Sequence, residues 1–147
     1  MFKFPVFPTA QIDSAPQTYR TEAKRASKRI LVISGQAVIR DLLERFFQID
    51  GHFVSTAADG EEGISRAKSL PVDLIVLDNG LPTSGTVRAQ LRAEAATAHL
   101  PVLWVGARLP RLDFEFLTPA DADDVLPMPF SFVQMRETAN RLLGRAA

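Results

Sequence analysis

The sequence predicts an α/β domain in which a parallel sheet is covered by helices on both faces. Short apolar segments alternate along the chain with longer segments of helical periodicity, which is the pattern of consecutive βα units. The segment 74–77 is apolar without interruption, as expected for a strand buried on both faces. At 147 residues the chain is long enough for one domain with a substantial core and short for two.

The first half of the chain provides two βα units. An apolar strand at 30–33 precedes a helix at 37–49, which Gly51 ends. The apolar residues of this helix are expected on one inward stripe: Ile39, Leu42, Leu43, Phe46 and Phe47. A second strand at 53–57 follows, and the turn residues Asp59-Gly60 introduce a helix at 61–69.

The second half provides three more units. The expected segments are a strand at 74–77, a helix at 87–96, a strand at 102–105, a helix at 111–117, a strand at 124–126 and a helix at 132–143. Pro101 introduces the fourth strand, in which Trp104 is expected to be core, and Ser131 is suited to cap the last helix. Five βα units with right-handed crossovers give a flavodoxin-like doubly wound sheet with strand order 2-1-3-4-5.

Composition excludes several classes of function. The formal net charge is zero, so the sequence does not indicate binding to nucleic acid or to an anionic membrane. The absence of cysteine excludes disulfides and thiolate chemistry. No apolar stretch reaches the roughly 18 residues of a membrane span, and the prolines near the N-terminus interrupt any signal-peptide pattern. We therefore expect a cytoplasmic protein.

Residues 1–28 differ from the rest and are interpreted as an N-terminal extension with little structure of its own. They contain Pro5, Pro8 and Pro16 and many small polar residues. The extension is either a loosely held tail or a segment that docks on the domain or a partner through its apolar residues, Phe2, Phe4, Val6 and Phe7. The single folded domain is expected to occupy residues 29–147, with no attached output domain.

Asp78 is the most informative candidate site residue. It directly follows the apolar segment 74–77, and Asn79-Gly80-Leu81-Pro82 comes next. A carboxylate at the carboxyl end of a buried parallel strand lies where open α/β sheets carry their chemistry.

Several blocks around Asp78 resemble the receiver domain of bacterial two-component response regulators. These blocks are 39–43 (Ile-Arg-Asp-Leu-Leu), 57–63 (Ala-Ala-Asp-Gly-Glu-Glu-Gly), 71–78 (Pro-Val-Asp-Leu-Ile-Val-Leu-Asp) and 122–130 (Ala-Asp-Asp-Val-Leu-Pro-Met-Pro-Phe). The resemblance implies that Asp78 matches the aspartate that accepts a phosphoryl group from a histidine kinase and becomes 4-aspartylphosphate. It also implies a cis peptide bond between Met128 and Pro129.

The sequence departs from the family at each position that assists this aspartate. Ser34-Gly35 replaces a pair of acidic Mg²⁺ ligands, Gly106 replaces the switch threonine or serine, and Met128 replaces a lysine. Val125 stands where the family has a switch aromatic residue. Because Mg²⁺ is held mainly through carboxylates and phosphate oxygens, we expect Mg²⁺ binding to be lost or very weak, and no other cofactor. Asp78 is then expected to be hydrogen-bonded to Ser34 or to nearby backbone N–H groups.

These departures predict a stand-alone, degenerate receiver that acts as a phosphorylation-independent protein-interaction module and not as an enzyme. Its expected partners are proteins, such as a histidine kinase or another signalling protein. Phe114 and Leu117 are candidates for the partner surface, because the family binds partners through this region. One alternative is a conventional single-domain response regulator in a phosphorelay, phosphorylated on Asp78. Another is a flavodoxin-like binder of a small anion or nucleotide, although the chain lacks a GxGxxG motif.

Overall fold

A five-stranded parallel sheet organises the chain in a computed structural model, which describes residues 27–106 and 124–146. The strand order is β2-β1-β3-β4-β5, which confirms the predicted flavodoxin-like topology. The strands are β1 (Arg29–Ile33), β2 (Phe53–Ala57), β3 (Leu74–Asp78), β4 (Val102–Gly106) and β5 (Asp124–Pro127). The helices are α2 (Ala37–Ile49), α3 (Gly60–Ser69), α4 (Ser84–Ala93) and α5 (Phe132–Ala146).

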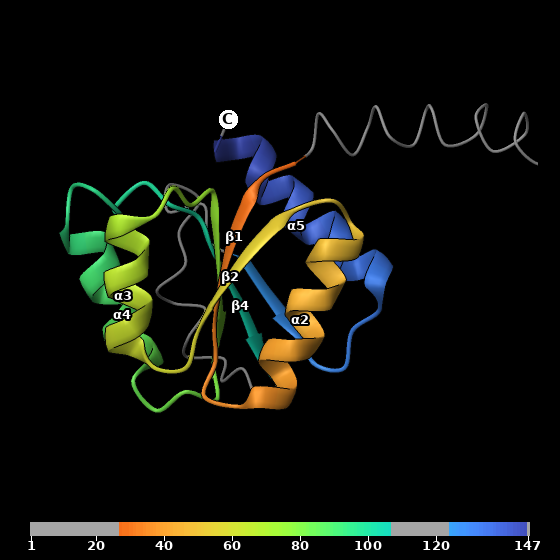
Figure 1. Cartoon of the computed structure of the whole chain (residues 1–147), viewed down its shortest axis with the longest axis horizontal. Helices are drawn as coiled ribbons and strands as arrows, with labels where there is room; N and C mark the ends of the chain where they lie inside the picture. Colours follow the sequence, from red (N-terminus) through yellow and green to blue (C-terminus); the bar gives the residue numbers. More distant parts are fainter. Residues whose placement is uncertain (1–26, 107–123, 147) are drawn as a thin grey trace, which may run out of the picture.

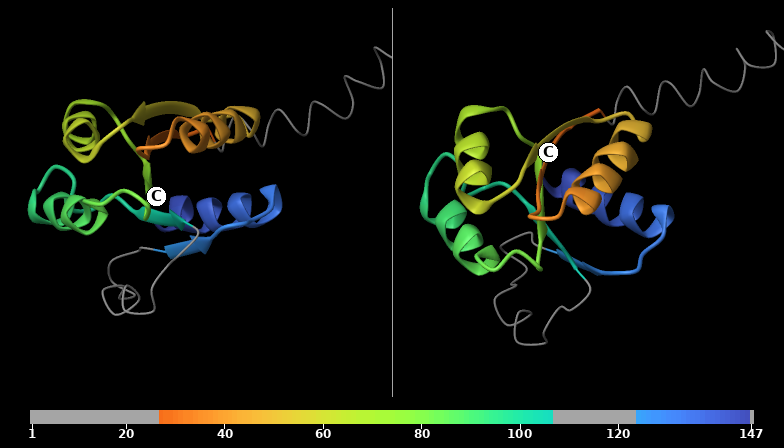
Figure 2. Two further views of the ribbon diagram at one scale, coloured as in Figure 1. Left: turned by 90° about the horizontal axis from the view of Figure 1, so that it is seen from below. Right: turned by 60° about the horizontal axis from the view of Figure 1, so that its bottom comes forward.

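The helices cover the sheet in two pairs, with α3 and α4 on one face and α2 and α5 on the other (Figure 1). Figure 2 shows the strands between these two pairs from below. Because side chains alternate along a strand, Ile30 and Val32 of β1 pack toward α2 and α5, whereas Leu31 and Ile33 pack toward α3 and α4. The domain therefore has two apolar clusters, one on each face of the sheet.

Local capping explains where the helices begin and end. Gly51 has a φ of 92°, which ends α2 in the left-handed conformation that glycine favours. The Asp59 carboxylate accepts the Glu62 N–H at 2.8 Å, and Glu62 in turn accepts the Ala58 N–H at 2.9 Å. This N–H and the neighbouring Arg66 side chain lower the pKa of Glu62. Ser131 caps α5 as predicted, since its hydroxyl accepts the Gln134 N–H at 3.1 Å.

Helix α4, the third helix of the sequence prediction, differs from that prediction by three residues at each end. It spans Ser84–Ala93, whereas periodicity predicted 87–96. The helix ends early because Glu94 is extended and the Thr97 hydroxyl donates to the Leu91 carbonyl at 2.7 Å. That carbonyl is thus satisfied outside the helix, and the chain turns toward β4.

Two further sequence predictions concern this core and its surroundings. Trp104 is buried in the cluster toward α3 and α4, as predicted. The helix predicted at 111–117 lies outside the described residues, as do residues 1–26 of the predicted N-terminal extension. Within the described ranges, no helix has both the length and the apolarity that crossing a bilayer requires.

Candidate functional site at the carboxyl ends of the strands

The fold brings four of the predicted site residues to one edge of the sheet. Asp78 and Gly106 are the last residues of β3 and β4, Ser34 directly follows β1, and Met128 directly follows β5. In a parallel sheet the carboxyl ends of all strands lie at the same edge, so these positions are neighbours. Ser34 is 0% exposed and Asp78 is 4% exposed.

The Asp78 carboxylate is held by two hydrogen bonds within the chain. The Ser34 hydroxyl donates to Oδ2 at 2.7 Å, and the Gly80 N–H donates to Oδ1 at 2.8 Å. Both contacts match the sequence prediction that Asp78 is bonded to Ser34 or to nearby backbone N–H groups. Each carboxylate oxygen therefore has a neutral donor, which satisfies a buried acceptor without a cation.

The loop after β1 is fixed by its own contacts. The Gln36 N–H donates to the Ser34 hydroxyl oxygen at 3.1 Å, and Arg40 Nη1 donates to the Ser34 carbonyl at 2.7 Å. The Arg40 contact was not predicted from the sequence; its signal is an arginine one helical turn inside α2. Gly35 is exposed, and a Cβ there would meet Leu81 Cδ1 at 3.5 Å, an ordinary contact distance. Position 35 therefore has room for a side chain.

Neither switch position carries a hydroxyl group that could form a hydrogen bond to a phosphoryl oxygen. Gly106 is buried, and its carbonyl accepts the Met128 N–H at 2.8 Å. Val125 is partly buried and packs against the cluster that contains Trp104. Both positions are thus built into the sheet and its packing.

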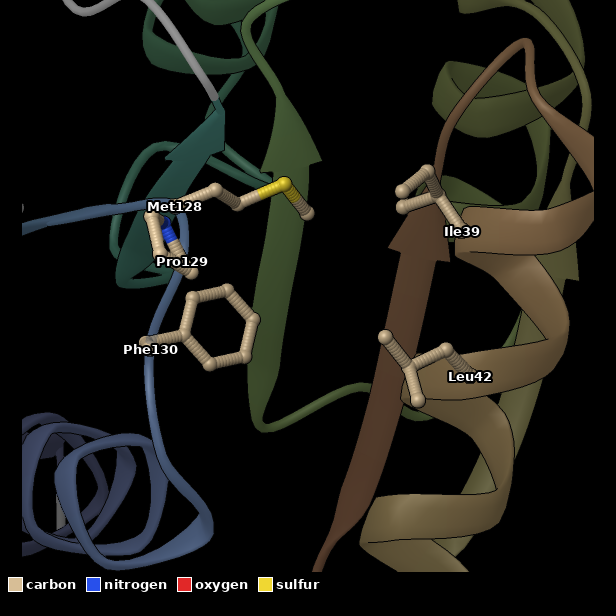
Figure 3. Close-up of a pocket in the computed structure, with 5 residues that line it drawn as sticks. All are labelled: Ile39, Leu42, Met128, Pro129 and Phe130. Atoms are coloured by element: carbon tan, nitrogen blue, oxygen red, sulfur yellow. The ribbon is translucent and has the colours of Figure 1, made fainter.

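Met128 and the two residues after it line an apolar groove beside the site. The groove has a volume of about 410 Å³, and its walls are Met128, Pro129 and Phe130 on one side and Ile39 and Leu42 of α2 on the other. Figure 3 shows the Met128 side chain extending toward α2. The Met128–Pro129 peptide bond is cis, as predicted.

The groove also corrects the predicted inward stripe of the first helix. Leu43, Phe46 and Phe47 are buried as predicted, whereas Leu42 is 46% exposed and Ile39 is only partly buried. The apolar positions of α2 span a wider arc than the sheet covers, so Leu42 lies at the edge of the core and lines the groove. Sequence reasoning missed this surface and chose Phe114 and Leu117, which lie outside the described residues.

The acidic and imidazole groups of the described ranges do not gather at the site. No three histidine, aspartate or glutamate side chains there lie close enough to share a metal ion. Among the described residues at the carboxyl ends of the strands, Asp78 provides the carboxylate. The other positions there provide the Ser34 hydroxyl, a glycine at 106 and the Met128 thioether. Proteins usually hold Mg²⁺ through one or two carboxylates together with phosphate oxygens and water, and Asp78 is the single carboxylate of this donor set.

Comparison with known proteins places this geometry in context. The family model described as the response regulator receiver domain matches residues 30–140. The DNA-binding dual master transcriptional regulator RpaA of Synechocystis sp. is 36% identical over 119 residues, which cover 80% of this chain and 49% of that protein. The alkaline phosphatase synthesis transcriptional regulatory protein PhoP of Bacillus subtilis is 30% identical over 120 residues, covering 82% and 50%. The chain spans about half the length of these curated relatives.

Solved structures agree with the assigned topology. Response regulator TrrA of Thermotoga maritima, solved in complex with Mg²⁺-BeF, has a TM-score of 0.67 at 29% identity, covering 78% of this chain and 98% of that one. Chemotaxis protein CheY4 of Vibrio cholerae has a TM-score of 0.72 at 24% identity, covering 80% and 99%, which shows a shared fold. Because the curated relatives are transcriptional regulators, the expectation of no nucleic-acid partner stays a prediction.

Proposed function

The chain belongs to the response regulator receiver domain family, and on that premise we propose that it is a degenerate receiver that binds protein partners in two-component signalling independently of phosphorylation. The observation that carries the proposal is the neutral hydrogen bonding of Asp78 by Ser34 and Gly80. In this proposal residues 29–147 form the receiver domain, and its role is binding rather than catalysis.

Electrostatics makes a phosphoryl group on Asp78 unfavourable. A phosphoryl group adds close to two negative charges, and phosphoryl transfer depends on cations that neutralise the developing oxygen charge. An ammonium at about 4 Å would contribute about 4 kcal/mol at an effective dielectric constant of about 20, and Met128 contributes none of this. Arg40 carries a guanidinium near the loop, but its hydrogen bond goes to the Ser34 carbonyl.

The residues present also do not fit Mg²⁺. Mg²⁺ requires near-octahedral oxygen coordination and usually binds through one or two carboxylates together with phosphate oxygens and water. Here the neutral Ser34 hydroxyl is already engaged as a hydrogen-bond donor to Asp78, and Gly35 offers no side chain. A single buried carboxylate remains, so Mg²⁺ binding is expected to be very weak.

The apolar groove supports the binding role. Leu42 is half-exposed, and Met128 and Phe130 are partly buried around a hollow of about 410 Å³. A hydrophobic groove that opens to solvent is typical of a surface that receives a partner side chain. Met128 belongs both to the groove and to the degenerate pocket positions, so a partner bound in the groove would contact the border of that pocket without using its chemistry.

A phosphodonor experiment tests the proposal. The 147-residue chain is incubated with Mg²⁺ and either acetyl phosphate or beryllofluoride, and its intact mass and amide chemical shifts are recorded. TrrA serves as the positive control, because that protein has been solved with Mg²⁺-BeF. We expect no adduct and no Mg²⁺-dependent shifts. An adduct that disappears in Asp78→Asn would overturn the proposal and favour a conventional phosphorylated regulator.

A restored pocket sharpens this test. Gly35→Asp combined with Met128→Lys adds one carboxylate and one ammonium. A Cβ at position 35 would lie 3.5 Å from Leu81 Cδ1 and 3.8 Å from the Ala58 carbonyl oxygen, which are ordinary contact distances. The double variant should gain Mg²⁺-dependent shifts near Asp78, whereas Met128→Lys alone should gain none. If neither variant responds, the missing side chains are not the reason for inertness.

Binding is tested with purified dimerisation domains of histidine kinases as probes. We expect wild type and Asp78→Asn to bind with the same affinity, with and without a phosphodonor. Leu42→Asp should weaken binding, because it places a charge in the groove wall. Binding that requires the phosphodonor would contradict phosphorylation independence.

A further inference from the structure

The outer surface of α2 exposes large apolar side chains. Val38 is 75% exposed, Leu42 46% and Ile49 65%, and Phe53 at the start of β2 is 70% exposed. Phe132 and Val133, at the start of the neighbouring α5, are exposed as well. Among the described residues most exposed large hydrophobic side chains therefore lie on one side of the molecule. Such a concentration is typical of an interaction surface.

The spacing on α2 indicates the kind of partner. Val38, Leu42, Arg45 and Ile49, here called the α2 stripe, are separated by four, three and four residues. This is the spacing of the seam between two helices of a coiled coil. The stripe is distinct from the buried face of α2, which is formed by Leu43, Phe46 and Phe47. α2 is thus apolar on two sides, one used by the core and one left for a second helix.

We propose that the α2 stripe binds the α2 stripe of a second copy of this chain, with the two helices antiparallel. A two-fold axis between Leu42 and Arg45 would place Val38 of each copy opposite Ile49 of the other. The same axis would place Leu42 opposite Arg45. Every contact then occurs twice, as an isologous dimer interface requires.

The surface beside Ile49 is hollowed in the way that this pairing needs. A shallow hollow of about 400 Å³ is lined by Arg45, Gln48 and Ile49. In knobs-into-holes packing a side chain enters a hole formed by four residues of the facing helix, and these three positions would supply most of the hole for the residue opposite Ile49. That residue is Val38 of the second copy, which is the most exposed apolar member of the stripe.

Charge complementarity selects a second copy as the occupant. Asp41 and Arg45 are exposed, and neither forms an ion pair with another residue within the described ranges. In the antiparallel arrangement, the aliphatic part of Arg45 would cover Leu42 of the second copy and its guanidinium would reach Asp41 there. Both copies supply both charges, so the pair forms twice.

The expected dimer is weak. α2 has 13 residues and is therefore about 20 Å long, so one helix pair buries less than the roughly 1,600 Å² of a standard interface. Leu42 belongs both to the stripe and to the groove. A partner in the groove, on the premise of the proposed function, would therefore compete with the second copy.

Sedimentation equilibrium of the 147-residue chain tests the proposal without any partner or phosphodonor, so its result is independent of the proposed function. Between about 10 μM and about 1 mM, the range of weak complexes, the average mass should rise from 16.2 kDa toward twice that value. Leu42→Glu should remain monomeric. A wild-type mass that stays at 16.2 kDa throughout would overturn the proposal.

A charge swap tests the antiparallel register. Asp41→Arg alone and Arg45→Asp alone should each weaken association by at least about tenfold, because like charges then face each other twice. An equimolar mixture of these two variants should associate again as a heterodimer. Glu61→Arg, an exposed reversal on α3, is the matched control and should associate like wild type. Failure of the mixture to regain association, with both variants folded by circular dichroism, would exclude this pairing.

Discussion

Gly106 lies so close to Asn79 that a Cβ on Gly106 would be 3.0 Å from the Asn79 Cβ. The surrounding backbone is fixed, because the Asn79 N–H donates to the Val105 carbonyl at 2.7 Å and the Met128 N–H donates to the Gly106 carbonyl at 2.8 Å. A Cβ at position 106 therefore requires the Asn79 side chain or the β3–α4 loop to shift by a few tenths of an ångström. The loss of the switch residue is coupled to the packing of its neighbours.

Gly106→Ser should consequently destabilise the protein, by about 1–3 kcal/mol as is typical of overpacking. Urea unfolding at neutral pH measures the change in free energy. Adding Asn79→Gly removes the opposing Cβ and should recover part of the loss, whereas adding Asn79→Ala keeps that Cβ and should not. If Gly106→Ser is as stable as wild type, the close approach is not a constraint.

Two helical glycines should respond to alanine with opposite signs. A Cβ on Gly63 of α3 would lie 2.5, 2.9 and 3.1 Å from three side-chain atoms of Ile33, so rotation of the Ile33 terminal methyl alone cannot relieve the clash. We expect Gly63→Ala to cost about 1–3 kcal/mol. A Cβ on Gly85 of α4 meets nothing within 4 Å, so Gly85→Ala should stabilise by about 0.5–1 kcal/mol. Thermal and urea unfolding of both variants check the signs, and a stabilising Gly63→Ala would contradict close packing of α3 on β1.

The Ser34–Asp78 hydrogen bond should appear as an energetic coupling in a double-mutant cycle. Ser34→Ala removes the donor to a buried carboxylate oxygen and should cost about 1–3 kcal/mol. Ser34→Ala in the Asp78→Asn background should cost less, because the charge that the hydroxyl stabilises is then absent, with a coupling of about 0.5–3 kcal/mol. Urea unfolding of the four proteins gives the coupling. Strict additivity would show that the two side chains do not interact in solution.

The sheet was predictable because each strand carries its own signal. Apolar segments such as 74–77 have no polar interruption, and the strand order follows from the crossover rule once five βα units are recognised. The C-terminal end of α4 was wrong because it depends on the Thr97 hydroxyl bonding the Leu91 carbonyl, a tertiary contact that helical periodicity does not encode. The local sequence pattern therefore predicted which of the described helices and strands form, whereas a side-chain contact decided where α4 ends.

The candidate site was predictable in part. The position of Asp78 followed from its place after a buried strand, and its contact with Ser34 followed from the order of the parallel strands. The groove was missed because Leu42 fits the inward period of α2, and only packing against the sheet decides which apolar positions are covered. The contact of Arg40 with the Ser34 carbonyl joins residues six positions apart across a loop whose path the sequence does not specify.

His52 links the start of β1 to the end of α2 through a neutral imidazole. It is buried, and its Nδ1 accepts the Lys28 N–H at 3.0 Å, so that nitrogen carries no proton. Burial lowers the pKa of His52 in the folded protein, and the nearby Lys28 acts in the same direction. Asp50, which is paired with Arg136, and Asp73, which is paired with Arg29, oppose this effect without cancelling it.

The stability of the domain should therefore decrease as the pH falls below about 6.5, the value at which the histidine titrates in the unfolded chain. Below that pH the unfolded chain binds a proton that the folded protein does not, whereas above it both forms are neutral and the full stability is present. Urea midpoints measured between about pH 7.5 and about pH 5.5, above the range where most carboxylates titrate, follow the change. His52→Asn keeps a side-chain acceptor for the Lys28 N–H but does not titrate, so its midpoint should vary less with pH. Identical pH dependence in wild type and His52→Asn would mean that another group controls stability in this range.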